Sequence, residues 1–315
     1  MAARTGALEA APLASASKSR GLYADAFMRI VREKPLGLFG GILVAIFIVM
    51  AVATPLVSTH GPNELGPIED RLLGPSFSHL FGTDNLGRDV YSRVVFGARV
   101  SMTISLIAVA AATFTSLSLG IVSGFFGGWI DTIVQRLVDG FIAFPGLVLL
   151  LAVVAVFRDT DAPFLPTDGL FRTQLVLLMI TIGLLLGVGN SRVIRGATLV
   201  VVNETYVEAA RALGASNMRI MRSYILPNVM APMITLATLG LGVAILLEAS
   251  LSFLGLGVPP DTPTWGGMLN REARAFMTEN AWIAVFPGLA LSLAVFGFNM
   301  LGDALRDVLD PRLRS

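Results

Sequence analysis

Six long stretches of apolar residues without Asp, Glu, Lys or Arg alternate with polar segments along the chain. They occupy residues 37–57, 100–122, 140–157, 173–191, 228–247 and 281–302. A helix needs about 20 mainly apolar residues to cross the roughly 30 Å hydrocarbon core of a bilayer. The pattern therefore predicts six transmembrane helices. Pro145 and Pro287 lie inside two of these runs, where membrane helices tolerate proline.

The composition supports the same interpretation. Of the 315 residues, 54% are hydrophobic and 14% are charged, and the mean hydropathy is +0.74. Soluble domains carry about 25% charged residues, so the deficit indicates a membrane protein. We expect an all-α polytopic membrane protein, and a net charge of +1 gives no indication of nucleic-acid binding.

The first apolar run could also belong to a secretory signal peptide, because Ala51-Val52-Ala53 imitates a cleavage site. The basic segment before it is too long for a signal peptide, and the apolar run is too extended. An uncleaved first helix is the favoured interpretation.

The distribution of Lys and Arg predicts the orientation, because these residues are enriched on the cytoplasmic side of membrane proteins. With the N-terminus inside, fifteen of the 23 Lys and Arg residues fall on the inner side and eight on the outer side. We therefore expect an N-in/C-in protein.

The chain then divides into five parts. A cytoplasmic tail (1–36) precedes the first transmembrane helix (37–57), an extracytoplasmic loop (58–98), a core of five transmembrane helices (99–303) and a cytoplasmic tail (304–315). In the first tail we expect disorder, followed by a short amphipathic helix over 23–31. An interfacial helix is expected over 91–100, with Arg93 and Arg99 at the headgroups.

The loop after the first helix contains turn-forming residues but little chemistry. Gly82, Asp84, Asn85 and Gly87 predict a structured turn region. The chain has no Cys, and its two histidines, His60 and His79, predict no metal cluster. We expect both histidines to lie in a solvated loop.

The longest charged, amphipathic segment between two apolar runs is Tyr206 to Pro227, within a loop spanning 203–227. It predicts a helix over 204–213 with Asn203 as N-cap, a left-handed Gly214, and a second helix capped by Ser216. Pro227 is expected to end that second helix. Tyr206, Ala210 and Leu213 share one face of the first helix.

Helix–Gly–helix is also the outline of a DNA-binding helix-turn-helix. Here the segment lies between the fourth and fifth apolar runs, on the predicted inner side. A docking surface for a cytoplasmic partner is therefore favoured, and no nucleic acid is expected.

Four charged residues close to the apolar runs are candidates for a partner interface or a gate: Asp131, Arg136, Asp139 and Glu248. For Glu248 the alternative is a hydrogen-bonded structural carboxylate at the outer end of the fifth run. For Arg136 and Asp139 the alternative is a local ion pair on one helix.

Several motifs resemble one family. Glu208-Ala-Ala210, Gly214 and Leu226-Pro227 are similar to the cytoplasmic coupling loop, or EAA loop, of importer-type ABC transporter permeases. Other stretches resemble the C-type permease of the dipeptide/oligopeptide branch: Gly82 to Val90, Gly97 to Ser101, Gly127 to Pro145, Glu248 to Gly257, Pro263 to Gly266, and Phe298 to Arg312. Two positions depart from the family pattern. Tyr224 replaces the usual Ile or His, and Gly187 to Asn190 lacks the usual aromatic residue.

The resemblance implies a type I ABC importer permease fold in a bacterial inner membrane. It implies a homologous second permease, two cytoplasmic ATPase subunits or one fused one, and an extracytoplasmic solute-binding protein. ATPase coupling is expected at Tyr206, Glu208, Ala209, Ala210, Leu213, Gly214, Leu226 and Pro227.

The sequence contains no G-x-x-x-x-G-K-[ST] phosphate loop. We therefore expect no cofactor in this chain, and expect the partner ATPases to bind ATP and Mg. Peptides are the expected cargo, with nickel, glutathione, opines or oligosaccharides as alternatives. A secondary transporter and a membrane enzyme are two further function classes, but paired repeats with central acids and converging catalytic residues are not evident.

Overall fold

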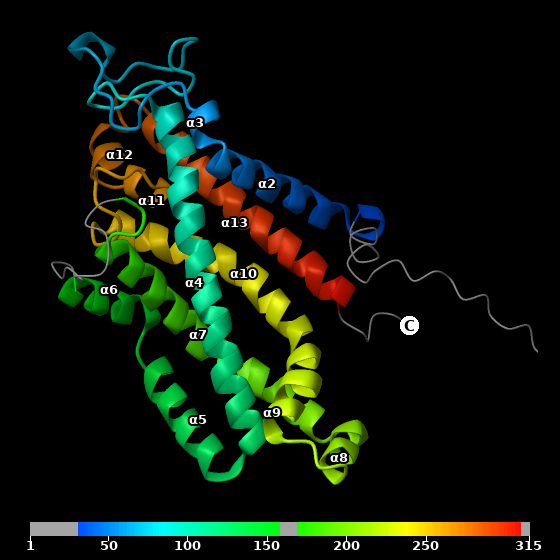
Figure 1. The fold of residues 1–315 in the computed structure, drawn as a ribbon. Coiled ribbons are helices and arrows are strands. Elements are labelled where there is room, and N and C mark those ends of the chain that lie inside the picture. The colour runs from blue at the N-terminus through cyan, green and yellow to red at the C-terminus, as the bar shows by residue number, and fades with distance from the viewer. Residues whose placement is uncertain (1–30, 158–168, 310–315) are drawn as a thin grey trace, which may run out of the picture.

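The fold is a bundle of crossing helices (Figure 1). The computed structural model describes residues 31–157 and 169–309. Within these ranges no strand occurs, and the β-type pairing is an isolated antiparallel bridge between Thr83 and Asp89. The predicted all-α architecture is confirmed for this part of the chain.

The helices differ widely in length. They are α2 (Pro35–Val52), α3 (Thr54–Val57), α4 (Val90–Phe126), α5 (Gly128–Ile142), α6 (Gly146–Phe157), α7 (Thr173–Val202), α8 (Thr205–Ala212), α9 (Asn217–Ile220), α10 (Leu226–Phe253), α11 (Trp265–Met268), α12 (Arg271–Phe276) and α13 (Trp282–Leu309). A 3₁₀ turn, η1 (Ile68–Asp70), lies in the loop after α3, and a π-helix, η2 (Met221–Ile225), joins α9 to α10.

The most extensive helix pair is α4 with α7, and small residues make it possible. A Cβ at Gly183 would lie 2.6 Å from the carbonyl oxygen of Ala108, and one at Gly187 would lie 2.6 Å from Thr115 Cβ. Both distances are too short for a side chain, so glycine lets the two backbones approach. The hydroxyl of Ser116 also donates to the carbonyl oxygen of Gly187 at 3.1 Å. The unusual Gly187 therefore has a packing role.

Helices α2 and α13 run antiparallel and pack closely. A Cβ at Gly40 would lie 2.7 Å from the carbonyl oxygen of Gly297. Near the start of α2, Lys34 Nζ lies 2.6 Å from Asp307 Oδ2 of α13. The start of α2 and the end of α13 therefore lie next to each other. This agrees with an even number of membrane crossings, which places both ends on the same side of the membrane.

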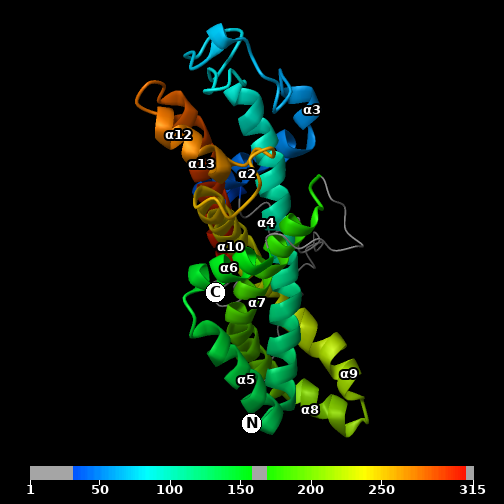
Figure 2. The same cartoon turned by 90° about the vertical axis from the view of Figure 1, so that its left-hand side faces the viewer.

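Two sets of short elements mark opposite ends of the molecule. The loop over 58–89 and α12 lie at one end of the bundle in both views (Figures 1 and 2). The junction of α4 with α5 lies at the other end, next to α8 and α9. The long α4 extends between these two ends.

Five helices are long and apolar enough to cross a membrane: α2, α4, α7, the continuous helix Asn217–Phe253 and α13. Helices α5 and α6 form a sixth crossing if the pair spans as one unit, with a bend of 84° between them. The prediction of one helix over 140–157 is therefore wrong. The 12 residues of α6 extend only about 18 Å, and the chain breaks just before Pro145 because proline disfavours a helical preceding residue.

Other predicted boundaries also need correction. The expected interfacial helix over 91–100 is not a separate helix, because these residues form the first part of α4, which begins at Val90. The first apolar run is interrupted at Ala53, between α2 and α3. Helix α13 extends to Leu309, beyond the expected start of the C-terminal tail at 304. The expectations for 1–30, including most of the helix over 23–31, lie outside the described residues.

Candidate functional site

A short helical hairpin connects α7 to α10 at one end of the molecule (Figure 1). Helix α8 ends at Ala212, and Gly214 follows two residues later with a φ of 79°, the predicted left-handed conformation. Gly214 N donates to the carbonyl oxygen of Arg211, and Ala215 N donates to that of Ala210. These two bonds are the Schellman motif that glycine favours after a helix. The turn between the two helices is thus determined locally.

The two helix starts follow the prediction only in part. Ser216 caps α9 as expected, because its hydroxyl accepts a hydrogen bond from Arg219 N at 3.4 Å. Helix α8 begins one residue later than predicted, with Glu204 instead of Asn203 at the N-cap position. The Asn203 side chain donates to the carbonyl oxygen of Leu199, so it completes α7 instead.

Pro227 does not end the second helix, contrary to expectation. The chain runs through it into α10, and residues Met221–Ile225 widen into a π-helix just before it. The wider turn accommodates the proline ring, which would otherwise meet the carbonyl group four residues earlier. The Asn228 side chain donates to the carbonyl oxygen of Tyr224 at 2.6 Å. The hairpin is therefore continuous with α10, a long membrane-type helix.

The inner face of the hairpin packs against the ends of the long helices. Val207 and Ile220 are fully buried in a cluster with Phe125 of α4 and Ile194 of α7. The guanidinium of Arg211 lies over the Phe125 ring, 5.5 Å from its centroid. The hairpin is consequently held by α4, α7 and α10 together.

The outer face of the hairpin is open. Tyr206 is 41% exposed and Leu213 is 88% exposed. Glu208, Ala209 and Gly214 are exposed as well.

The predicted face is corrected at one position. Ala210 is only 6% exposed, because it packs on this chain's own core. At the second arm, Leu226 is half-buried and Pro227 is exposed. Tyr224, the departure from the family pattern, packs against Tyr206 with ring centroids 6.1 Å apart.

Charged residues near the same end tie α5 to α7. Arg195 Nε donates to Asp131 at 2.6 Å, and Asp139 pairs with Arg192. Asp131 also accepts from Ser123 of α4. The alternative of a local Arg136–Asp139 pair is wrong, since Asp139 pairs with Arg192 and Arg136 is exposed.

Glu248 is fully buried inside this chain. Ser101 Oγ of α4 donates to one carboxylate oxygen at 3.1 Å, and Ser252 Oγ donates to the other at 2.7 Å. These contacts fit the structural carboxylate among the two interpretations and link α4 to α10.

A cavity of about 590 Å³ lies between α6, α7 and the segment after α10. Arg172 lines it, near Asp261 at 3.4 Å and bonded to the Thr262 hydroxyl at 3.0 Å. Arg172 is not among the site residues predicted from sequence, because only the fold brings it to the polar segment around 261.

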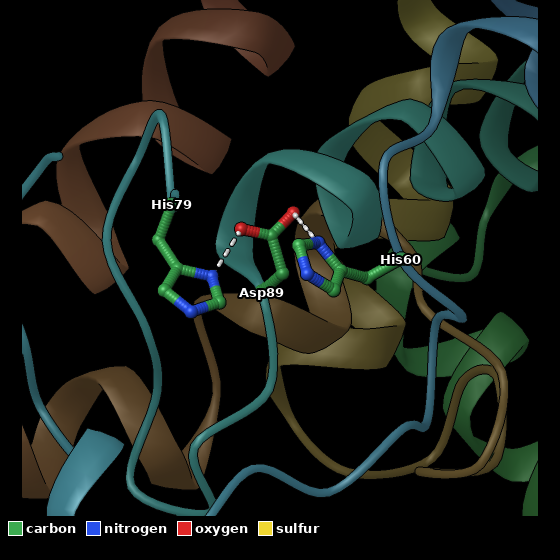
Figure 3. A group of neighbouring side chains, drawn as sticks. All are labelled: His60, His79 and Asp89. Atoms are coloured by element: carbon green, nitrogen blue, oxygen red, sulfur yellow. Dashed lines mark hydrogen bonds and ion pairs between the residues drawn. The ribbon is translucent and has the colours of Figure 1, made fainter. Parts of the chain in front are cut away.

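The expectation that the two histidines form no metal cluster stays a prediction. They lie in the loop over 58–89 as expected, but they converge on Asp89 (Figure 3). These three residues are close enough to share one metal ion.

The described residues form a bundle of membrane-type helices with an exposed hairpin held by three of them, and this fold defines a polytopic membrane protein. Comparison with known families identifies its class. Residues 116–315 match the family described as "Binding-protein-dependent transport system inner membrane component". Residues 22–75 match the "N-terminal TM domain of oligopeptide transport permease C". The chain belongs to the family of ABC importer permeases.

Individual relatives are similar over nearly the whole chain. The dipeptide transport system permease protein DppC of Alkalihalophilus pseudofirmus is 39% identical over 293 residues, covering 93% of this chain and 91% of that protein. The glutathione transport system permease protein GsiD of Escherichia coli is 37% identical over 312 residues, covering 99% and 98%.

A solved structure shares the fold. A chain of the MetNI methionine ABC transporter in an inward-facing conformation aligns with a TM-score of 0.53 and 19% identity. The alignment covers 69% of this chain and 96% of that one. Together these findings make the protein a multi-pass membrane protein and a non-catalytic permease subunit.

Proposed function

We propose that this chain forms half of the translocation pathway of an ATP-driven importer for di- or oligopeptides in a bacterial inner membrane. The observation that carries the proposal is the exposed hairpin held by α4, α7 and α10 in a chain 39% identical to a dipeptide permease. A second, homologous permease completes the pathway. A solute-binding protein delivers the peptide from outside the membrane.

The chain itself carries no cofactor in this proposal. Two ATPase subunits, or one fused one, bind ATP and Mg and dock on the hairpin. The docking surface consists of the exposed residues Tyr206, Glu208, Ala209, Leu213 and Gly214. Ala210 supports this surface from below by packing on the core.

Movement of the ATPase reaches the pathway through rigid connections. Val207 and Ile220 fix the hairpin on α4 and α7 through their buried contacts. The π-helix and Pro227 continue it into α10. A displacement of the hairpin therefore moves the ends of three long helices at once.

Several classes of substrate are candidates for the transported cargo. Dipeptides are favoured by the similarity to DppC, and glutathione, itself a tripeptide, by the similarity to GsiD. Nickel complexes, opines and oligosaccharides are less favoured, because these two relatives are described as transporters of dipeptides and of glutathione.

Reconstitution in proteoliposomes tests the proposal. We would express this chain with its partner permease, ATPase subunits and binding protein, and measure ATP-dependent uptake of labelled dipeptide, tripeptide and glutathione. Uptake that needs both ATP and the binding protein is expected, with competition only among peptides.

The control is the purified chain alone, which should show no ATP-driven uptake. ATP-independent uptake by the single chain, driven by an ion gradient, would favour a secondary transporter. Uptake of a non-peptide alone would overturn the peptide assignment but leave the ATP-driven mechanism in place.

A further inference from the structure

The only two histidines of the sequence meet at one carboxylate. His79 Nδ1 lies 3.0 Å from Asp89 Oδ1, and His60 Nδ1 lies 3.8 Å from Asp89 Oδ2. The two imidazole rings stack with centroids 5.1 Å apart. Figure 3 shows both rings directing a nitrogen toward the carboxylate between them. Segments 19 positions apart in the sequence thus place their only imidazoles at one point.

The carboxylate is fixed before any ligand binds. The Asp89 side chain is 1% exposed, and its Oδ2 accepts a hydrogen bond from Ser92 N at 2.8 Å. Asp89 is therefore the N-cap of α4, and its orientation is set by the helix. Oδ1 faces His79 and retains a lone pair for a further partner, because a carboxylate oxygen offers two acceptor positions.

Backbone hydrogen bonds hold both histidines in place. The Ser92 hydroxyl accepts from His60 N at 3.0 Å and from Thr59 N at 3.2 Å. The carbonyl oxygen of His79 accepts from Ser76 N at 2.8 Å and from Gly82 N at 2.9 Å. The three side chains are thus brought together by the loop and by the first turn of α4.

The donor set defines the class of ligand. One nitrogen from each histidine and one Asp89 oxygen all lie within 4.8 Å of one another. Two imidazoles and a carboxylate suit Zn²⁺, which keeps a fourth position for water in such sites. Ca²⁺ and Mg²⁺ prefer oxygen ligands alone. The His60 side chain is 36% exposed, so solvent reaches the group from that side.

We propose that His60, His79 and Asp89 bind one divalent transition-metal ion, with Zn²⁺ as the best match. The ion would replace the direct His79–Asp89 contact and join three segments: the chain around residue 60, the chain around residue 79 and the start of α4. Its effect is to fasten the loop over 58–89 onto the long helix that reaches the hairpin end.

The chain has no Cys and no other His, so no further thiol or imidazole competes for the metal in a binding test. The full chain, purified with a tag that contains no histidine and placed in lipid nanodiscs, would be titrated with Zn²⁺ against a chromophoric chelator. One equivalent should bind to the native protein. His60→Gln and Asp89→Asn should each weaken binding at least tenfold, and Asn keeps an oxygen for the cap of α4.

Glu69→Gln is the matched control, because it removes an exposed carboxylate from the same loop without touching the group. Its Zn²⁺ affinity should equal that of the native chain. Co²⁺ should give d–d absorption bands in the native chain and lose them in His60→Gln. Zn²⁺ should also raise the melting temperature of the native chain but not that of His60→Gln.

Circular dichroism would verify that each variant keeps its helices, and His60 is the safest position because it is the most exposed of the three. Two results would overturn the proposal: no Zn²⁺ binding by the native chain, or equal binding by the native chain and by the double variant His60→Gln/His79→Gln. In either case the group is a hydrogen-bonded His–Asp pair alone.

Discussion

Gly214 is the residue whose backbone sets the direction of the hairpin's second arm. Its φ is 79°, and a Cβ built there would meet no heavy atom within 4 Å. A substitution is therefore opposed by backbone conformation and not by crowding. For a residue other than glycine this left-handed conformation costs about 1–2 kcal/mol, and a β-branched residue is the worst case.

We expect Gly214→Val to leave the protein abundant in the membrane but to weaken its hold on the ATPase and reduce substrate-stimulated ATP hydrolysis. Gly214→Asn is the matched control, because asparagine tolerates the left-handed region. Co-purification of the ATPase and ATP hydrolysis are the measurements. If Gly214→Val binds the ATPase and transports normally, the coupling role of this turn is wrong.

Substitution of Glu248 distinguishes a structural role of this carboxylate from a role in a gate. Glu248→Ala removes the acceptor of the buried Ser101 and Ser252 hydroxyls. It should therefore lower stability by about 1–3 kcal/mol. Glu248→Gln keeps an acceptor oxygen and should lose less. The melting temperature in detergent measures both variants, with Ser250→Ala as control, because Ser250 is a half-buried position on the same helix whose hydroxyl donates to Leu246 O of that helix. Native-like melting with lost transport would instead favour the gate.

Local features of single residues were predictable from sequence. Gly214 and Ser216 act on backbone groups within a few positions, so residue type and spacing suffice for them. Glu248 depends on Ser101, 147 positions away, and Asp89 depends on His60 and His79. Such contacts exist only after the chain has folded, and spacing along the sequence carries no sign of them.

At the scale of elements, hydrogen bonds and ion pairs of polar side chains attach α5 to its neighbours, and a broad apolar contact is not the main attachment. Asp131 bonds to Arg195 of α7 and to Ser123 of α4. The outward side of α5 carries exposed apolar residues at Trp129, Ile133 and Leu137. The ion pair therefore has a larger share in positioning α5 than it would have between two buried helix faces.

Charge exchange tests this attachment. Asp131→Arg and Arg195→Asp should each destabilise the protein by about 1 kcal/mol, a modest value because both side chains are partly exposed. The double variant should regain most of the loss. The melting temperature and the rate of proteolysis near Gly127–Gly128 are the readouts. Exchange of the more exposed Asp139–Arg192 pair is the control and should change less. Additive losses in the first double variant would mean that the pair does not hold α5.

Hydropathy predicted which segments form helices but not where the helices end. It follows the apolar interior of a membrane, whereas α4 and α7 continue beyond their apolar runs. Helix α7 passes through Arg192 and Arg195 to Val202, and α4 begins at Val90 with Arg93 in its first turn. Both arginines of α7 find partners on α5, so charge does not end the helix there.

For the whole molecule, the fold places the loop over 58–89 and the hairpin at opposite ends (Figures 1 and 2). The excess of Lys and Arg at the hairpin side and in the tails favours the hairpin end as cytoplasmic. The coupling proposal depends on the same orientation, since an ATPase docks only from the cytoplasm.

Single cysteines in this Cys-free chain decide the orientation. Phe77→Cys and Met218→Cys both replace exposed side chains, 105% and 68% exposed, at opposite ends of the bundle. Neither side chain takes part in a helix cap, so the fold should be kept. In intact cells a membrane-impermeant maleimide should label Phe77→Cys and spare Met218→Cys. After permeabilisation both should be labelled, which serves as the control for accessibility. The reverse pattern in intact cells would place the hairpin outside, where no cytoplasmic ATPase can reach it, and the coupling proposal would fail together with the predicted orientation.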